Sequence, residues 1–579
     1  MQFKRLLRYA GKYRKYLILC PLVMIGEVVM EMLLPTITAQ LIDEAIPACE
    51  QSGNLSQVLA LGGMMLLMAL LSMGFGMAGS RLSALGGMGF SHNLRQAIFE
   101  RVQRFSFKNI DKFSTASLVT RLTTDVNQAQ NLVMMLVRMA VRSPFMFIMA
   151  LFMALRMNAT LVPILLVSIP LLAAGMALIM TKAFPRFQAM MKKYDALNAS
   201  VQENLIAIRV VKAFVRATHE KEKFHASADE VTATQRAAEK IVLWGSPLMQ
   251  LLMYGSMVAV LWLGGRQVIG GTMEIGALSS FITYIMQILM SLMMLSFLFV
   301  SFVMAKASIA RICEVLDEEP EIESPRQAET KVADGSVVFD HVGFSYTGDK
   351  SNLTLTDINC AIRAGETIGV IGGTGSAKST LVSLIPRLYD VTCGRVLVGG
   401  RDVREYDIHA LRDQVAMVLQ KNVLFSGSIK ENLRWGDANA TDAEITAACQ
   451  ASAADEFVRA LPGGYDMDLG QGGVNVSGGQ KQRLCIARAL LKKPKIIIFD
   501  DATSAVDTAT DAHIRAALRD TMPETTKIII AQRITSVMDA DRIIVLNDGQ
   551  IVDMGAHDEL MARCEIYREV YTSQQKGVA

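Results

Sequence analysis

Four long runs of uncharged, mostly apolar residues constrain this sequence more than any other feature. Each exceeds the roughly 20 residues that a helix needs to cross a bilayer. They are residues 54–80, 157–181, 241–265 and 275–305. Two further apolar segments carry charges: residues 16–46 contain Glu27 and Glu31, and residues 131–157 contain Arg138 and Arg142. The sequence therefore predicts a transmembrane domain of six helices within residues 1–313, embedded in a lipid bilayer.

The distribution of Lys and Arg predicts how these helices are oriented. Basic residues gather before the first helix, between the second and third, and between the fourth and fifth. The other connections, residues 47–57, 158–160 and 266–274, carry almost none. Because basic loops stay in the cytoplasm, both ends of the chain are expected there.

The two long basic segments are expected to continue the helices well beyond the membrane. Short cross-pieces at residues 113–124 and 205–215 mix apolar with basic side chains. Such a mixture is typical of a helix that docks on another domain, although a solvated amphipathic helix would have the same composition.

The overall composition excludes several classes of protein. The chain has 579 residues, of which 51% are hydrophobic, and its net charge of +3 gives no reason to expect nucleic acid as a partner. Its eight cysteines are scattered singly, so neither a zinc site nor a disulfide framework is predicted. The 36 methionines are typical of an adaptable cavity or of ordinary filler in apolar helices.

The second half of the chain changes character after an acidic, proline-containing linker at residues 314–335. Within residues 336–579, short β-rich runs alternate with helical patterns, which predicts a soluble α/β nucleotide-binding domain. The predicted strands are residues 337–339, 367–371, 396–398, 414–419, 496–499, 527–531 and 542–546.

A glycine-rich loop follows the strand at 367–371 and precedes an apolar helical stretch. Strand, loop and helix in this order are what a phosphate-binding loop requires, although such a loop can also merely turn the chain. Lys378 would reach the β- and γ-phosphates of ATP, and Ser379 would hold Mg²⁺. The candidate ATP-binding residues are Gly372, Gly373, Thr374, Gly375, Ser376, Ala377, Lys378, Ser379 and Thr380.

Ala377 stands where the phosphate-loop pattern has glycine. If its φ is negative, the methyl group fits with mild crowding. If its φ is positive, nucleotide binding is expected to suffer.

Further candidate residues follow in chain order. Tyr346 could stack on a purine, or it could be an ordinary packed aromatic residue. Gln420 follows a predicted strand, and Asp500 ends another, where a carboxylate would orient Mg²⁺ through water. A second anion-binding helix start is predicted at Ser477, Gly478, Gly479 and Gln480.

Six membrane helices followed by this series of motifs resemble the ATP-binding-cassette exporters over essentially the whole chain. The resemblance implies a half-transporter in the bacterial cell (inner) membrane that hydrolyses ATP with Mg²⁺. Two chains would pair, and each ATP would lie between the phosphate loop of one chain and Ser477–Gln480 of the other. Gln420 would contact Mg²⁺, residues 113–124 and 205–215 match the coupling helices, and residues 503–507 would pass signals between the two sites.

Two departures from the family pattern concern catalysis. The family usually has glutamate where this chain has Asp501, and histidine where it has Gln532. The shorter carboxylate is withdrawn by about 1.5 Å, and glutamine carries neither a proton for transfer nor a charge. Gln471, where glutamate is commoner, is a further resemblance to the degenerate chain of heterodimeric exporters.

The resulting expectation is a heterodimeric exporter of drugs, lipids or other amphipathic compounds. Its partner would be a second, different half-transporter, whose active site the motif Ser477–Gln480 completes. This chain's own site would bind MgATP but hydrolyse it poorly. The alternatives are a homodimer with two slow sites and a regulatory subunit that ATP gates.

Glu27 and Glu31 lie four residues apart, so both occupy one face of the first membrane helix. An ionised carboxylate inside a bilayer costs about 2.5–3.5 kcal/mol by insertion scales, so each should face a partner or a cavity. Arg138 and Arg142 are candidate partners in a structural ion-pair cluster. Alternatively, at least one carboxylate lines a cavity and favours cationic substrates.

Overall fold

The structure is a computed structural model that describes residues 2–502 and 506–576. The chain divides into two compact units. The first comprises Met1–Gln103 and Thr115–Asp317, and the second comprises Arg104–Ser114 and Glu318–Ala579.

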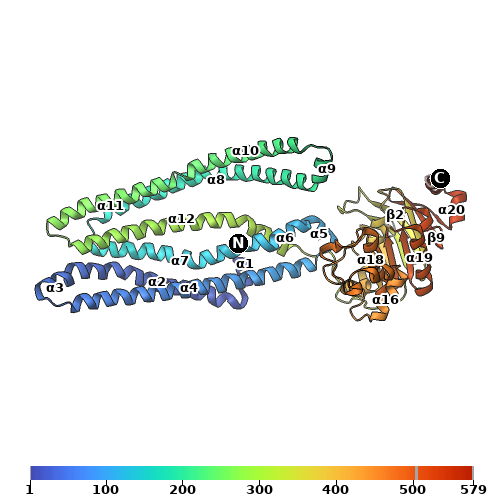
Figure 1. Ribbon diagram of the computed structural model, residues 1–579, viewed down its shortest axis with the longest axis horizontal. Coiled ribbons are helices and arrows are strands. Elements are labelled where there is room, and N and C mark those ends of the chain that lie inside the picture. The colour runs from blue at the N-terminus through green and yellow to red at the C-terminus, as the bar shows by residue number, and fades with distance from the viewer. Residues whose placement is uncertain (1, 503–505, 577–579) are drawn as a thin grey trace. The chain divides into compact units, whose positions relative to one another are not determined.

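Six helices among the described residues are long and apolar enough to cross a membrane, as predicted (Figure 1). They are Leu7–Ser52, Ser56–Gln103, Thr115–Met157, Val162–Ile206, Ala217–Ile269 and Ile275–Asp317. The elements of this unit are α1 (Gln2–Leu6), α2 (Arg14–Gln40), α3 (Ile46–Ser52), α4 (Ser56–Gln103), α6 (Thr115–Thr120), α7 (Val126–Met157), α8 (Val162–Ile206), α9 (Ile208–Ala213), α10 (Ala217–Val242), α11 (Gly245–Ile269) and α12 (Ile275–Asp317). A helix of 48 residues such as α4 is about 72 Å long, so much of it extends beyond an apolar layer about 30 Å thick.

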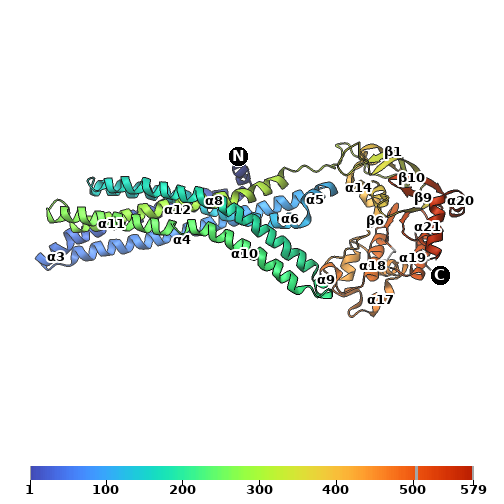
Figure 2. The same cartoon turned by 90° about the horizontal axis from the view of Figure 1, so that it is seen from above.

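Small residues determine how closely the membrane helices pack. A Cβ atom added to Gly79 of α4 would lie 2.4 Å from the sulfur of Met24 on α2, and one added to Gly86 would lie 2.4 Å from Leu17. Membrane helices associate through such close backbone approaches, because lipid provides little hydrophobic drive between them. Helix α2 lies beside α4, and α7 lies beside α12 (Figure 1). Both views show α8 beside α10, which α9 joins at one end (Figures 1 and 2).

Two predicted boundaries are wrong. The fourth membrane helix begins at Val162 rather than at residue 157, because Asn158 accepts a hydrogen bond from the Thr160 amide at 3.0 Å and turns the chain. The predicted linker at 314–335 also begins too early, since α12 continues to Asp317. Its last turns are buried, and Glu314 pairs with Arg121 at 2.9 Å.

The first predicted cross-piece is also wrong. Residues 113–124 mostly begin the third membrane helix, and the short separate helix is α5 (Phe107–Phe113). Ser106 caps α5. This helix belongs to the second unit, in which Lys112 of α5 pairs with Glu318 at 2.6 Å. The second predicted cross-piece, residues 205–215, contains α9.

The second unit is an α/β domain with two sheets. A four-stranded sheet has the order β2-β1-β4-β5, and a six-stranded sheet has the order β10-β9-β3-β8-β7-β6. The strands are β1 (Val337–Phe344), β2 (Leu355–Ile362), β3 (Thr367–Gly372), β4 (Cys393–Val398), β5 (Arg401–Asp402), β6 (Val415–Val418), β7 (Ile496–Asp500), β8 (Thr526–Ile530), β9 (Arg542–Asn547) and β10 (Gln550–Gly555). The helices are α13 (Lys378–Ser383), α14 (Ile408–Gln414), α15 (Ile429–Leu433), α16 (Asp442–Ala451), α17 (Asp455–Ala460), α18 (Gly478–Leu491), α19 (Thr508–Thr521), α20 (His557–Arg563) and α21 (Glu565–Lys576).

The topology of the six-stranded sheet brings the predicted ATP site together. Strands β6, β7, β8, β3 and β9 run parallel. Ligands in such sheets bind at the carboxyl ends of the strands. The phosphate loop follows β3, Gln532 follows β8, Asp500 ends β7 with Asp501 directly after it, and Gln420 follows β6.

Candidate ATP-binding site

The phosphate loop holds its lysine over its own backbone. Lys378 Nζ donates to the carbonyls of Gly372 and Gly373 at 2.9 and 2.8 Å, and to Ser376 Oγ at 3.2 Å. No described atom lies within 4 Å of a Cβ built on Gly373 or Gly375, so the space beside these backbone positions is open. Burial lowers the pKa of Lys378, and the attraction of Asp501 and Asp500 opposes that shift. A cation held above an open glycine loop fits the triphosphate of ATP.

Ala377 adopts a left-handed backbone conformation, which favours glycine. Its φ is +68° and its ψ is +26°, in the left-handed region. An L-residue with a Cβ atom costs roughly 1–2 kcal/mol there. The observed φ is therefore positive, and it is not the negative value that would accommodate the methyl group.

Ser379 and Asp500 offer adjacent oxygen ligands for a metal ion. Ser379 Oγ donates to Asp500 Oδ1 at 2.7 Å, and burial raises the pKa of Asp500 against the effect of that hydrogen bond. Among the described residues, no group of three or more His, Cys, Asp and Glu side chains could hold a metal. Two oxygen ligands fit Mg²⁺, which usually combines one or two protein ligands with substrate phosphates and water.

Asp501 is the centre of a group of amide side chains. Gln532 Nε2 donates to Asp501 Oδ2 at 2.8 Å, and Gln482 of α18 donates to the Asp501 carbonyl at 3.3 Å. Burial raises the pKa of Asp501, and hydrogen bonds from Gln420 and Gln532 oppose that shift. The structure thus brings Asp501, Gln532 and Gln420 together, as their predicted role requires. Sequence reasoning missed Gln482, although its place two residues after Gln480 was a usable signal.

Tyr346 lies beside the phosphate-loop helix. Its hydroxyl shares a 2.9 Å hydrogen bond with the Thr380 hydroxyl. Its ring packs edge-on against the ring of Tyr389, with 5.3 Å between the ring centroids. The side chain is nevertheless 45% exposed. The structure therefore combines features of both interpretations of Tyr346, a packed aromatic residue and a platform for a purine.

The signature residues form the start of α18. Ser477 caps this helix by accepting from the Gln480 amide at 3.4 Å, while its own amide donates to Gln480 Oε1 at 2.8 Å. Ser477 and Gly478 are exposed, and no described atom lies within 4 Å of a Cβ built on Gly478. The start of α18 can therefore approach a ligand outside this chain's own phosphate loop. Of the predicted signalling segment, residues 503–505 lie outside the described residues.

Two known families match the two halves of the chain. The family described as ABC transporter transmembrane region matches residues 17–292, and the family described as ABC transporter matches residues 355–504. The ABC transporter ATP-binding protein YfiB of Bacillus subtilis is 37% identical over 556 residues, which cover 96% of this chain and 95% of that protein.

This chain belongs to the ABC transporter family.

Other relatives of this ABC transporter have names that state a substrate. The ATP-dependent lipid A-core flippase of Desulfotalea psychrophila is 33% identical and covers 84% of this chain and 85% of its own. A fatty acid ABC transporter ATP-binding/permease protein of Mycobacterium bovis is 34% identical over a match that covers 82% of this chain and 75% of that protein. The solved structure of a bacterial Atm1-family ABC exporter with ATP bound matches with a TM-score of 0.81 and 24% identity, over 97% of this chain and 99% of that one, which shows the exporter fold.

The family assignment confirms the coarser predictions made from the motifs. The chain is a multi-pass membrane protein with an ATP-binding domain, and an ABC ATPase domain couples ATP hydrolysis to transport. Exporters of this family work as dimers and act on amphipathic compounds at the membrane.

The membrane domain of the transporter holds the predicted charged cluster. Arg142 of α7 lies 2.8 Å from Glu31 Oε2 and 3.4 Å from Glu27 Oε1, both on α2. The side chains of Arg142 and Glu27 are 18% and 13% exposed, and Glu27 Oε2 is buried without a hydrogen-bond partner among the described residues. Arg138 forms neither ion pair. The cluster therefore contains two carboxylates for one guanidinium.

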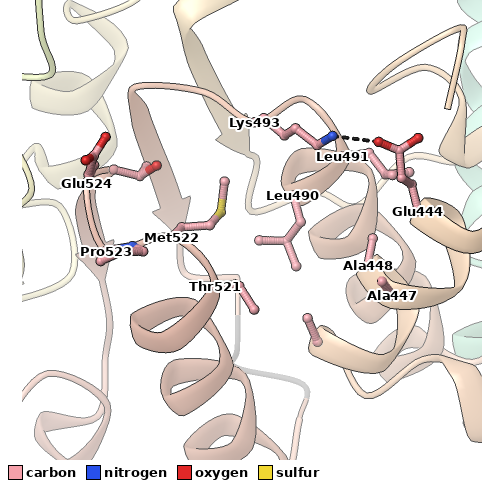
Figure 3. A pocket seen from close by; sticks show the side chains of 12 residues that line it. Glu444, Ala447, Ala448, Leu490, Leu491, Lys493, Thr521, Met522, Pro523 and Glu524 are labelled. Atoms are coloured by element: carbon pink, nitrogen blue, oxygen red, sulfur yellow. Dashed lines mark hydrogen bonds and ion pairs between the residues drawn. The ribbon is translucent and has the colours of Figure 1, made fainter.

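A pocket of about 500 Å³ in the ATP-binding domain lies away from these residues (Figure 3). It lies between α16, the end of α18 and the end of α19, and Lys493 pairs with Glu444 at its rim at 2.6 Å. None of its lining residues belongs to the phosphate loop or the signature motif. It is not part of the ATP site.

Proposed function

We propose that this chain is one subunit of a heterodimeric, ATP-driven exporter, and that its own site binds MgATP but hydrolyses it slowly. The observation that carries the proposal is the hydrogen bond from Gln532 to Asp501. Hydrolysis requires a group that polarises water as it attacks the γ-phosphorus and the bond to the leaving ADP breaks. Here the candidate carboxylate is short, and its neighbour is an amide that carries no charge.

The signature motif supports an active role for this chain at a second site. Ser477 and Gly478 are exposed at the start of α18, where helix amides can meet phosphate oxygens. In the proposed complex these residues complete the partner's ATP site. Hydrolysis then takes place mainly between this signature and the partner's phosphate loop.

The turn between α8 and α10 supports the presence of a partner chain. Phe214 and Val215, which follow α9, are 74% and 86% exposed. Two large apolar side chains at the tip of a long helical hairpin outside the membrane would be covered by another protein surface. In the proposed dimer, this turn docks on the partner's nucleotide-binding domain.

The orientation and substrate class are also part of the proposal. The basic segments support a cytoplasmic location in a bacterium for both termini and the nucleotide-binding domain, with the helices in the inner membrane. An amphipathic, lipid-like substrate is supported by the names of the flippase and the fatty acid transporter. It is also supported by an apolar pocket of about 370 Å³ between α8, α11 and α12, which four methionines help to line.

Purification of the native complex tests the heterodimer. A tagged copy of this chain is expected to bring down a second half-transporter whose sequence has glutamate and histidine at the positions of Asp501 and Gln532. Recovery of only untagged copies of this chain would instead support a homodimer with two slow sites. Transport that continues after all hydrolysis in the complex is abolished would support an ATP-gated regulatory subunit.

A further inference from the structure

The last described helix of the chain makes a two-point contact with the loop that carries Gln532. Gln574 of α21 donates its side-chain Nε2 to the Gln532 carbonyl at 2.7 Å. Its Oε1 accepts the backbone N–H of Ile534 at 2.9 Å. One side-chain amide therefore holds the backbone on both sides of Arg533.

The position of Gln574 is determined by the core of the domain. Tyr567 is fully buried, its hydroxyl lies 2.8 Å from His557 Nδ1, and Val570 and Tyr571 pack against the same core cluster. Residues spaced three, four and seven apart share one face of a helix. Tyr567, Val570, Tyr571 and Gln574 have this spacing, so the face that anchors α21 also presents Gln574 to the loop.

The contact continues to the nucleotide site. The backbone of Gln532 is held by Gln574, and its side chain donates to Asp501 Oδ2 at 2.8 Å. Polar groups recognise a phosphate best when they are held in place before it binds, because a small misplacement weakens the interaction. An anchored Gln532 is therefore better placed to donate to a γ-phosphate than one on an unsupported loop.

We propose that Gln574 is a positioning residue that holds Gln532 for the γ-phosphate, so that α21 sets the preference of this site for ATP over ADP. The inference rests on the proposed ATP-binding role of this site. It extends that role to a helix that none of the family's motifs includes.

The test compares Gln574→Ala with Gln575→Ala in the purified complex. Gln575 is a matched control, because it is the next residue of the same helix and its amide donates to Tyr571 instead of to the loop. ATP or ADP competes with a photoreactive azido-ATP for labelling of this chain, which a gel separates from its partner. In Gln574→Ala we expect ATP to compete about tenfold less well, the worth of one hydrogen bond to a charged group, and ADP to compete as before. Gln575→Ala should change neither value.

A double variant tests whether Gln574 acts through Gln532. In a Gln532→Ala background, Gln574→Ala is expected to cause no further loss of ATP competition. Equal losses for ATP and ADP, or the same additional loss in both backgrounds, would overturn the proposal in favour of a structural role of α21. If Gln532→Ala itself leaves ATP competition intact, the proposal is also overturned. The proposal that this chain forms a heterodimer is tested separately, by co-purification. If azido-ATP does not label the chain without any substitution, the proposed ATP-binding role is itself overturned.

Discussion

The Nε2 atom of Gln532 lies 2.8 Å from Oδ2 of Asp501. The two catalytic positions that depart from the family pattern are therefore in direct contact and form one local arrangement. A glutamate would reach farther towards a bound nucleotide by about 1.5 Å, and a histidine could carry charge. The contact makes Asp501 and Gln532 a single unit whose contribution to hydrolysis can be tested by mutating either residue.

The first prediction concerns which motif of this chain supports hydrolysis. Ser477→Ala is expected to lower ATP turnover by the complex about 10²-fold, because in the proposed complex it removes a group that faces the partner's ATP. Asp501→Asn is expected to change turnover little, since this site contributes little hydrolysis under the proposed function. Phosphate release by the purified complex in lipid measures both effects.

Ser477 also caps α18, so loss of a cap needs its own control. Thr441→Ala removes a capping box of the same kind from α16, outside both nucleotide motifs, and costs about 1 kcal/mol of stability. Thr441→Ala should leave turnover nearly unchanged. A loss from Asp501→Asn as large as that from Ser477→Ala would contradict the slow-site assignment.

The second prediction concerns the left-handed Ala377. Ala377→Gly removes the methyl group and the strain of a φ of +68°. The affinity of this chain for ATP, measured by competition for azido-ATP labelling, is expected to rise several-fold. Unchanged affinity would mean that the loop already accommodates alanine.

Ala453→Gly is the matched control for Ala377→Gly. Ala453 also has a positive φ, of +54°, but it lies in the turn after α16. Its substitution is expected to alter thermal stability without altering ATP affinity. The comparison separates relief of local strain from a specific effect on the phosphate loop.

Local sequence patterns predicted the membrane helices, the phosphate loop and the carboxylates after β7, because each depends on residues that are neighbours in the chain. The sign of φ at Ala377 and the contact of Gln574 with the loop after β8 depend on tertiary structure, and no local pattern reports them. The pairing of Arg142, and not Arg138, with both glutamates depends on the register of α7 against α2. Strands β2 and β10 were missed because they interleave polar residues such as Asp357 and Asp553 with apolar ones.

The third prediction separates the two interpretations of Tyr346. If its ring stacks on adenine, Tyr346→Ala should lower ATP affinity about tenfold, which corresponds to a stacking contribution of about 1–3 kcal/mol. Binding of inorganic tripolyphosphate should not change. Tyr346→Phe is the control, because it keeps the ring and loses only the hydrogen bond to Thr380. Equal losses for ATP and tripolyphosphate would show that Tyr346 instead supports the phosphate-loop helix.

The fourth prediction assigns different roles to the two membrane carboxylates. Glu31 makes the shorter contact with Arg142, so Glu31→Gln is expected to leave that guanidinium with only the longer contact to Glu27 and to lower the melting temperature. Transport of all substrates by Glu31→Gln should fall together. Thermal unfolding in detergent and transport into vesicles measure the two effects.

Glu27 has one carboxylate oxygen 3.4 Å from Arg142 and one buried oxygen without a hydrogen-bond partner among the described residues, and we propose that this carboxylate meets the cationic group of a substrate. An excess ionised carboxylate in a bilayer costs about 2.5–3.5 kcal/mol, so Glu27→Gln should leave the melting temperature unchanged or raise it. Transport of a cationic amphiphile is expected to fall, while transport of a neutral amphiphile of the same chain length persists. The double variant Glu27→Gln, Glu31→Gln should combine the lower stability of one change with the selective loss of the other. Equal losses for cationic and neutral compounds in a well-folded Glu27→Gln complex would rule out the cavity role and leave a purely structural ion-pair cluster.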